Sequence, residues 1–329
     1  MDAGSRPSVT PGATTPSRRT PSVRRTTTHD FTRGAGLHGP VNVVAIGRDL
    51  RTDGVGRTAV LGASRLELTV DFSDGVITDL AAEPADPALA SLVGATTFRG
   101  FRAALDQALP EERARGEVRG QLLDDLPMAL LLSGRVLRAA GIGLARRDPR
   151  GPMPVDICAG WVADGTLMGG MTDFGPPLQA GPVADEIESD GDPLGWHEHG
   201  ALPPNSTRRR RRLDVWRDGD VGSVECFFRD THVDVNGIET VVHEYTVNAN
   251  VDPNALTIVE CDALPGSLPY PECPAAAESA HRLPGAPIAG LRGAVLTELT
   301  GPTTCTHLND AFRSLEDVAH LLQSLPATA

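Results

Sequence analysis

The sequence contains no lysine, because every one of its 30 basic residues is arginine. This absence excludes a Schiff-base lysine, the lysine of a phosphate-binding loop and a lysine general base. It also suggests a bacterial genome rich in G and C. Aromatic residues make up only 4% of the chain, which argues against a stacking platform for single-stranded nucleic acid.

Long apolar runs are also missing, since no stretch approaches the 18 residues that a membrane helix needs. The net charge of −13 would repel both phosphate backbones and anionic lipid, so we expect neither nucleic acid nor membrane as a partner. The five cysteines are odd in number and widely spaced, and we see no secretory signal. This pattern predicts free thiols in a reducing cytoplasm rather than a disulfide framework.

The composition is otherwise that of a globular protein, with 40% hydrophobic and 22% charged residues. Residues 1–21 are rich in Ser, Thr, Pro and Arg, which predicts a disordered tail. Residues 140–205 form a connecting insertion. It contains one candidate strand pair, VDICAGWVAD and GTLMGG, followed by an acidic loop rich in Pro and Gly.

Short matches recur in the same order in the two halves of the chain, which indicates a diverged internal duplication. SVRRTTTHDF in the first half resembles STRRRRRLDV in the second, and LELTVD resembles HEYTVN. RGFRAA then resembles AGLRGA, and LLDDL resembles HLNDA. The sequence therefore predicts two copies of one unit, over residues 22–139 and 206–323, related by a pseudo-twofold axis.

Each copy has the pattern of strands followed by helices, so we predict an α+β fold in which helices cover an antiparallel sheet. The predicted strands span residues 41–47, 66–72, 75–81, 223–229, 239–249 and 256–262. The predicted helices span residues 98–109, 120–139, 273–283, 289–299 and 305–323.

The two copies differ in the residue types that carry chemistry. In the alignment, Cys305 falls opposite Gly120 and His307 opposite Leu122. Cys273 likewise falls opposite Asp86, and His243 opposite Leu66. We therefore expect the first copy to keep the fold and the second to carry the functional site, close to the interface between them.

Several motifs of the second half resemble the bacterial domain-of-unknown-function family numbered 2889. They are RRRRRLDVW, FRDTHVD, VVHEYTV, LPYPECPAA and CTHLNDAFRSL, of which the last is the most specific. The opening SVRRTTTHDF and GRDL also resemble the N-terminal part of that family, so the resemblance covers most of residues 21–323. It implies a bacterial group without an assigned role, and it implies no fold, activity or ligand.

The segment TCTHLND places Cys305, His307 and Asp310 at a predicted helix start, and we take these three as candidate catalytic residues. A thiol in the first helical turn gains from the helix dipole and the free amides, which favour the thiolate. A thiolate suits either a metal ligand or a nucleophile. The alternative is a half-buried cysteine beside a histidine that only caps the helix.

Two further residues extend this set to a candidate metal site. Cys273 lies at another predicted helix start, with Pro274 suited to the first helical position, and His243 lies on a predicted strand. Cys273, Cys305, His307 and His243 would supply the ligand number of a zinc or iron site. Because the spacing matches no standard zinc finger, purely structural roles for these residues remain an alternative.

Arg208 and Arg209, in the run of five arginines, are candidates for binding an anionic small molecule. Arginines that alternate between the two faces of a strand and serve a structural role are the alternative. The segment GVGRTAVLG lacks the following helix of a dinucleotide site, and we find no nicotinamide, flavin or PLP signature.

The first functional hypothesis is a metal-dependent enzyme, or a protein that handles a metallocofactor, with its site in the second copy. A second hypothesis is a non-catalytic binding or accessory module for an acidic small molecule or a partner protein. A third is an enzyme that uses a cysteine nucleophile without metal.

Overall fold

The computed structural model describes residues 15–34, 36–142, 154–172, 175–188 and 191–325. Eight strands form one antiparallel sheet in the order β4-β3-β2-β1-β5-β6-β7-β8, so β1 and β5 meet at its centre. The strands of the first half are β1 (Ser22–Thr32), β2 (Val41–Thr52), β3 (Thr58–Asp71) and β4 (Val76–Glu83). Those of the second half are β5 (Ser206–Asp218), β6 (Val221–Val233), β7 (Glu239–Asp252) and β8 (Thr257–Pro265).

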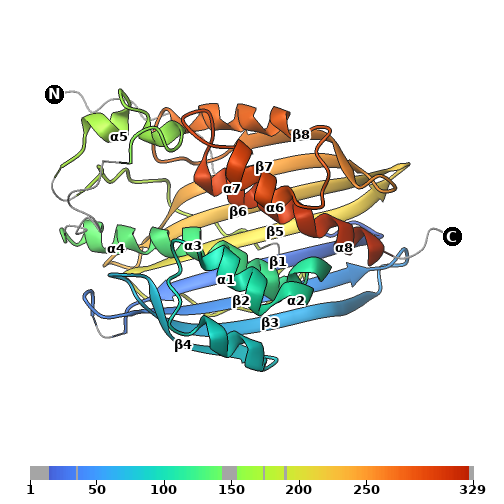
Figure 1. Cartoon of the computed structure of the whole chain (residues 1–329), viewed down its shortest axis with the longest axis horizontal. Coiled ribbons are helices and arrows are strands. Elements are labelled where there is room, and N and C mark those ends of the chain that lie inside the picture. The colour runs from blue at the N-terminus through green and yellow to red at the C-terminus, as the bar shows by residue number, and fades with distance from the viewer. Residues whose placement is uncertain (1–14, 35, 143–153, 173–174, 189–190, 326–329) are drawn as a thin grey trace.

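Helices follow the four strands of each half, and Figure 1 shows them lying across one face of the sheet. The first half contributes η1 (Pro87–Leu92), α1 (Phe101–Ala108), α2 (Pro110–Arg115), α3 (Val118–Leu132) and α4 (Gly134–Ala139). The second half contributes η3 (Cys273–Arg282), α6 (Leu291–Glu298), α7 (Thr306–Ser314), η4 (Leu315–Asp317) and α8 (Val318–Gln323). The prediction of an α+β fold with helices on an antiparallel sheet is confirmed.

The central strand β1 is buried on both of its faces, because successive side chains of a strand point to opposite sides. His29 points to the helix layer, where its Nε2 lies 2.8 Å from the carbonyl oxygen of Leu122. Thr26 and Thr28 point the other way, and their hydroxyls bracket the ring of His197 at 2.9 and 3.0 Å. The connector around His197 therefore covers the second face of the sheet at its centre.

Apolar side chains form two large clusters, one for each half of the sheet. Leu66, Phe101 and Leu123 belong to the first cluster, and Phe228, Tyr245 and Phe312 belong to the second. Packing of this kind on one sheet face is what the alternating strands and amphipathic helices require.

Charged residues fill the space between the two apolar clusters, and we call this group the charged seam: Arg25, Arg209, Arg211, Arg313, Asp124, Asp125, Asp310 and Asp317. Each arginine of the seam donates to a buried carboxylate, for example Arg211 to Asp125 at 3.0 Å and Arg313 to Asp124 at 2.6 Å. Buried charges of this kind are tolerated because they are paired and hydrogen-bonded. The two halves thus meet through buried ion pairs.

On the opposite face, two ion pairs cross the junction between β1 and β5 in a reciprocal way. Arg24 of β1 donates to Asp214 of β5 at 2.5 Å, and Arg208 of β5 donates to Asp30 of β1 at 2.5 Å. These positions lie directly opposite each other in the strand register.

The six predicted strands are present, and the two central strands, β1 and β5, were not among them. The predicted strand pair of the connector instead forms two short helical turns, η2 (Ala159–Trp161) and α5 (Thr166–Gly169). Of the predicted tail, residues 1–14 lie outside the described residues. Thr15 is buried and its amide donates to the carbonyl oxygen of Ile187 at 2.8 Å, so the end of that segment packs against the connector. None of the helices in the described ranges has the length and apolarity required to cross a bilayer.

Candidate metal centre

Asp230, His243 and His307 place three potential metal ligands together, with one atom of each within 4.8 Å of the others. Asp230 on β6 and His243 on β7 are direct partners in the strand register, next to a bulge, so their side chains share one face. His307 lies in the first turn of α7, which packs over β6 and β7. The sheet register and the start of one helix therefore build the group.

The contacts within the group are close. The Nδ1 atom of His243 lies 3.2 Å from Oδ2 of Asp230. The rings of His243 and His307 stack with centroids 3.8 Å apart and planes 22° from parallel. Arg209 holds the same aspartate through two hydrogen bonds, from Nε at 2.7 Å and from Nη2 at 2.9 Å. The carboxylate is thus fixed in place by the charged seam.

The electrostatic environment sets the protonation states of the group. Burial lowers the pKa of His243, although the hydrogen bond that its Nδ1 donates to Asp230 acts the other way, and burial lowers the pKa of His307 well below its ordinary value. Burial alone would raise the pKa of Asp230, but the charge and hydrogen bonds of Arg209 hold it far below its usual range. At neutral pH the group therefore has two neutral imidazoles and one carboxylate, which are the protonation states that bind metals.

The distances can be compared with those of a coordinated metal. An N···O separation of 3.2 Å, spanned by two bonds of about 2.1 Å, gives an angle of about 100° at the metal, which suits tetrahedral or octahedral geometry. For both rings to bind the same ion, their centroids must separate to about 5 Å, because each centroid lies about 3 Å from the metal. His307 is partly exposed, and its ring would have to move outward by about 1 Å to reach that separation.

Cys273 and Cys305 lie elsewhere, in a buried group with Cys158 and Tyr245. The hydroxyl of Tyr245 donates to the carbonyl oxygen of Cys273 at 3.1 Å, and burial raises the pKa of Cys273, with the neighbouring Cys305 and Cys158 acting in the same direction. Neither thiol is part of a set of three donors within the part of the chain that the structure describes. The structure therefore places His243 and His307 together and puts the two predicted cysteines in a separate group.

Burial raises the pKa of both Cys273 and Cys305 to about 12. Cys305 is the residue that caps α7, and the amides of Leu308 and His307 oppose this effect. The helix start was expected to favour the thiolate. Burial outweighs the amides, so both groups are neutral thiols at neutral pH.

Asp310, Arg208 and Arg209 all have protein partners. Oδ2 of Asp310 accepts from Arg209 at 2.9 Å, and its Oδ1 accepts from Arg102 at 3.0 Å. Arg209 thereby links Asp310 to Asp230. Arg208 lies on the other face of β5, where it donates to Asp30. Both guanidinium groups predicted to bind an anionic ligand are thus occupied by carboxylates of the chain.

Sequence reasoning missed Asp230, which the structure places at the centre of the group. The signal was present in the pairing of FRDTHVD with VVHEYTV, because antiparallel strands joined by a short turn bring Asp230 opposite His243. A bulge next to this pair makes the register hard to count from sequence.

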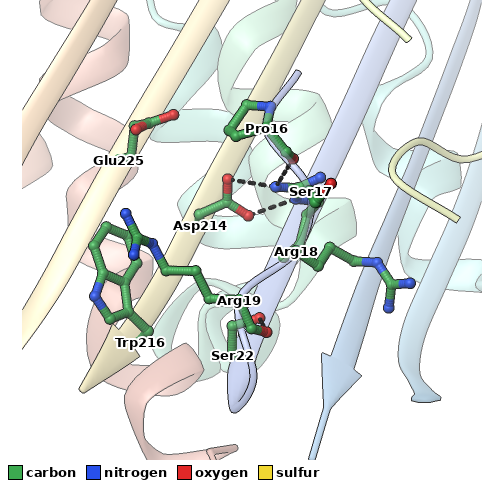
Figure 2. A pocket seen from close by; sticks show the side chains of 9 residues that line it. Pro16, Ser17, Arg18, Arg19, Ser22, Asp214, Trp216 and Glu225 are labelled. Carbon is green, nitrogen blue, oxygen red and sulfur yellow. Dashed lines mark hydrogen bonds and ion pairs between the residues drawn. The ribbon is translucent and has the colours of Figure 1, made fainter. Parts of the chain in front are cut away.

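A pocket of about 300 Å³ lies away from this group, between the segment around Arg18 and the strand β5. Figure 2 shows the side chain of Arg19 reaching Trp216, while the side chain of Arg18 points away from Asp214 and Trp216. Arg19 stacks over the ring of Trp216 at 4.2 Å, and Asp214 accepts from Arg24 at 2.5 Å. Among its other charged groups, Arg18 pairs with Asp192, Arg24 with Asp214 and Glu225 with Arg212, so we find no set of converging unpaired groups in the described residues of this pocket.

Comparison with known protein families gives a match within the second half of the chain. Residues 207–321 match a family described as "Protein of unknown function (DUF2889)". The resemblance noted from the motifs is confirmed over that stretch. No curated protein and no solved structure matches the chain. The family match covers Asp230, His243 and His307, and its description assigns no activity to them.

Proposed function

We propose that this protein is a metal-dependent enzyme whose metal is bound by Asp230, His243 and His307. The observation that supports it is the convergence of three donor atoms within 4.8 Å, from β6, β7 and the start of α7. The proposal keeps His243 and His307 from the sequence-based metal set and replaces the two cysteines with Asp230.

Two imidazoles and one carboxylate are a ligand set for zinc or for non-haem iron(II). Three protein ligands leave coordination positions for water and substrate, as catalytic rather than structural sites do. Zinc would act there as a Lewis acid or activate a water molecule, whereas iron(II) would support oxygen chemistry. The buried pair of Asp230 with Arg209 would hold the carboxylate in orientation.

Measurement of the number of metal ions bound per chain tests the proposal. Protein purified without chelator, or stripped and reloaded with Zn²⁺ or with Fe²⁺ under anaerobic conditions, is expected to hold about one ion per chain. His243→Ala and His307→Ala should each lower the affinity at least tenfold, because each removes one of three ligands. His281→Ala, which changes an exposed histidine on η3, is the matched control. Metal content far below one ion per chain and equal in all four proteins would contradict the proposal.

The stacking of His243 on His307 favours a second candidate, an enzyme that needs no metal. Asp230 accepts a hydrogen bond from Nδ1 of His243, which leaves Nε2 as a base in the manner of an Asp–His pair. Chelator-stripped protein would then keep its full activity on any substrate identified for it, and His243→Ala would abolish that activity.

We also infer that residues 22–139 and 206–323 are diverged copies related by an approximate twofold axis between β1 and β5. The strand order runs outward from that centre in both halves, and the pairs Arg24–Asp214 and Arg208–Asp30 exchange roles across it. Gly100 and Gly290 both adopt left-handed conformations immediately before the eight-residue helices α1 and α6. In an experimentally determined structure, superposition of the halves should bring Gly100 onto Gly290 and Asp125 onto Asp310. Failure to align these pairs would refute the duplication.

A further inference from the structure

A cluster of basic side chains borders the candidate metal centre, and it differs from the charged seam because its charges lack carboxylate partners. It consists of Arg135 and Arg138 on α4 and His232 on β6, with Tyr270 beside them. Arg135 is only 8% exposed and His232 only 5%. Among the described residues, no ion pair joins either arginine to an acidic group.

Three nitrogen atoms of this cluster are buried without a hydrogen-bond partner in the described part of the chain: Nε of Arg135, Nε of Arg138 and Nε2 of His232. A buried donor without a partner destabilises a fold by about 1–3 kcal/mol, and more when the group is charged. Three such atoms on neighbouring side chains are donors that a bound anion could satisfy.

Electrostatic interactions link these groups to one another and to His243. Burial lowers the pKa of both His232 and His243, and the charge of Arg135 adds to this effect on both residues, as the charge of Arg138 does on His232. Burial lowers the pKa of Arg135 to about 10, with Arg138 acting in the same direction. In the charged seam, by contrast, Asp230 and Asp310 outweigh the burial of Arg209 and raise its pKa.

The positions of the arginines are fixed by one stretch of the connector. Nη1 of Arg138 donates to the carbonyl oxygen of Pro176 at 3.0 Å, and Nη2 of Arg135 donates to that of Gln179. The hydroxyl of Tyr270 donates to the carbonyl oxygen of Pro177 at 2.8 Å. The same stretch continues to Pro182, whose carbonyl oxygen accepts from the amide of Val241, two residues before His243. The guanidinium groups are therefore held in place while their Nε atoms stay free.

We propose that Arg135, Arg138 and His232 bind the oxyanion group of a small-molecule substrate, a carboxylate or a phosphate, beside His243 and His307. Planar guanidinium groups recognise such groups through charge-assisted hydrogen bonds. Arg138 and Tyr270 are partly exposed, so the cluster is reachable from solvent. The assignment of the oxyanion to a substrate rests on the proposed metal-dependent function, whereas the binding of the anion does not.

The test uses full-length protein stripped of metal, so that anion binding is measured apart from metal binding. Inorganic phosphate and succinate are titrated calorimetrically at constant ionic strength, with chloride as the compensating ion. Saturable binding of phosphate alone would identify a phosphate site, and saturable binding of succinate alone a carboxylate site. Either result supports the proposal, and the absence of saturable binding of both anions overturns it.

Variants then locate the binding. Arg138→Gln and His232→Asn are expected to weaken the binding at least tenfold, because each removes one donor. Arg115→Gln, a change of an exposed arginine on α2, is the control and should bind like the unaltered protein. Unchanged affinity in both Arg138→Gln and His232→Asn would overturn the proposal, provided that circular dichroism shows both to be folded. Metal content is also measured on Arg138→Gln and His232→Asn. Failure of the metal proposal would appear as low metal content, and failure of the anion proposal as unchanged or absent anion binding, so the two failures can be told apart.

Discussion

The imidazole rings of His243 and His307 stack 3.8 Å apart, although one belongs to a central part of β7 and the other to the first turn of α7. Only two residues before His307, the thiol of Cys305 is buried beside Tyr245. The thiol of Cys305 and the imidazole of His307 therefore lie in different surroundings, although only one residue stands between them in the sequence.

The separation predicts different effects of Cys305→Ser and His307→Ala on metal content. Cys305→Ser should leave the metal-to-protein ratio unchanged, while His307→Ala should lower it. Elemental analysis of the two variants, prepared in parallel, makes the comparison. Loss of metal from Cys305→Ser would instead favour the ligand set predicted from sequence, with Cys273 and Cys305.

Asp124 on α3 is predicted to be among the least replaceable residues of the charged seam. It accepts from Arg313 at 2.6 Å and lies 3.0 Å from Nη1 of Arg113. Asp124→Ala should lower the free energy of unfolding by about 3–5 kcal/mol, because it leaves buried arginines without their counterion. Denaturation in urea measures this loss. Asp106→Ala, which removes an exposed partner of Arg113, should change it by less than about 0.5 kcal/mol.

His29 predicts a loss of stability in mild acid. Burial lowers its pKa from 6.5 to about 4. The unfolded chain therefore binds the proton more readily, so the contribution of neutral His29 is complete above pH 6.5 and falls as the pH drops towards 4. Between pH 7 and pH 5 the loss from this residue is on the order of 2 kcal/mol.

Other buried histidines also titrate in acid, for example His197, whose pKa burial lowers to about 3. The effect of His29 is therefore isolated by comparing how steeply the unfolding free energy falls with pH in the unaltered protein and in a variant at His29. His29→Gln keeps a donor for the carbonyl oxygen of Leu122 but does not titrate. Its unfolding free energy, measured by urea denaturation, should fall less steeply between pH 7 and pH 5. Equal slopes in both proteins would show that His29 carries no such effect.

The reciprocal ion pairs of β1 and β5 are expected to differ in strength. Arg208→Met leaves Asp30 without an arginine among the described residues, and should lower stability by about 3 kcal/mol. Arg24→Met should cost less, because Asp214 keeps Arg212 at 2.7 Å. Urea denaturation of the two variants shows which of them loses more of its unfolding free energy.

A double variant provides the internal check on this prediction. Arg208→Met combined with Asp30→Leu removes both charges, so it should recover much of the stability lost in Arg208→Met. If the double variant is no more stable than the single one, the unpaired charge of Asp30 is not the cause of the loss.

Local sequence patterns determined much of this protein. Alternating residues predicted the strands around residues 66–72 and 239–249, because the side-chain period of a strand depends on its own backbone alone. The helix near residues 305–323 was predicted from the spacing of Leu308, Phe312 and Leu315 for the same reason. The absence of lysine excluded every mechanism that needs a lysine side chain, and this conclusion required no structure.

Only the tertiary structure decided which charged residues belong together. The run from Arg208 to Arg212 gave no indication that Arg209 joins Asp230 to Asp310, or that Arg211 meets Asp125 of the other half. The pairs Arg209–Asp310 and Arg211–Asp125 join residues 101 and 86 positions apart in the chain. The attraction between charges depends on distance in space and on burial. Asp230 lies opposite His243 through strand register and beside His307 through helix packing, and neither relationship is a property of a local segment.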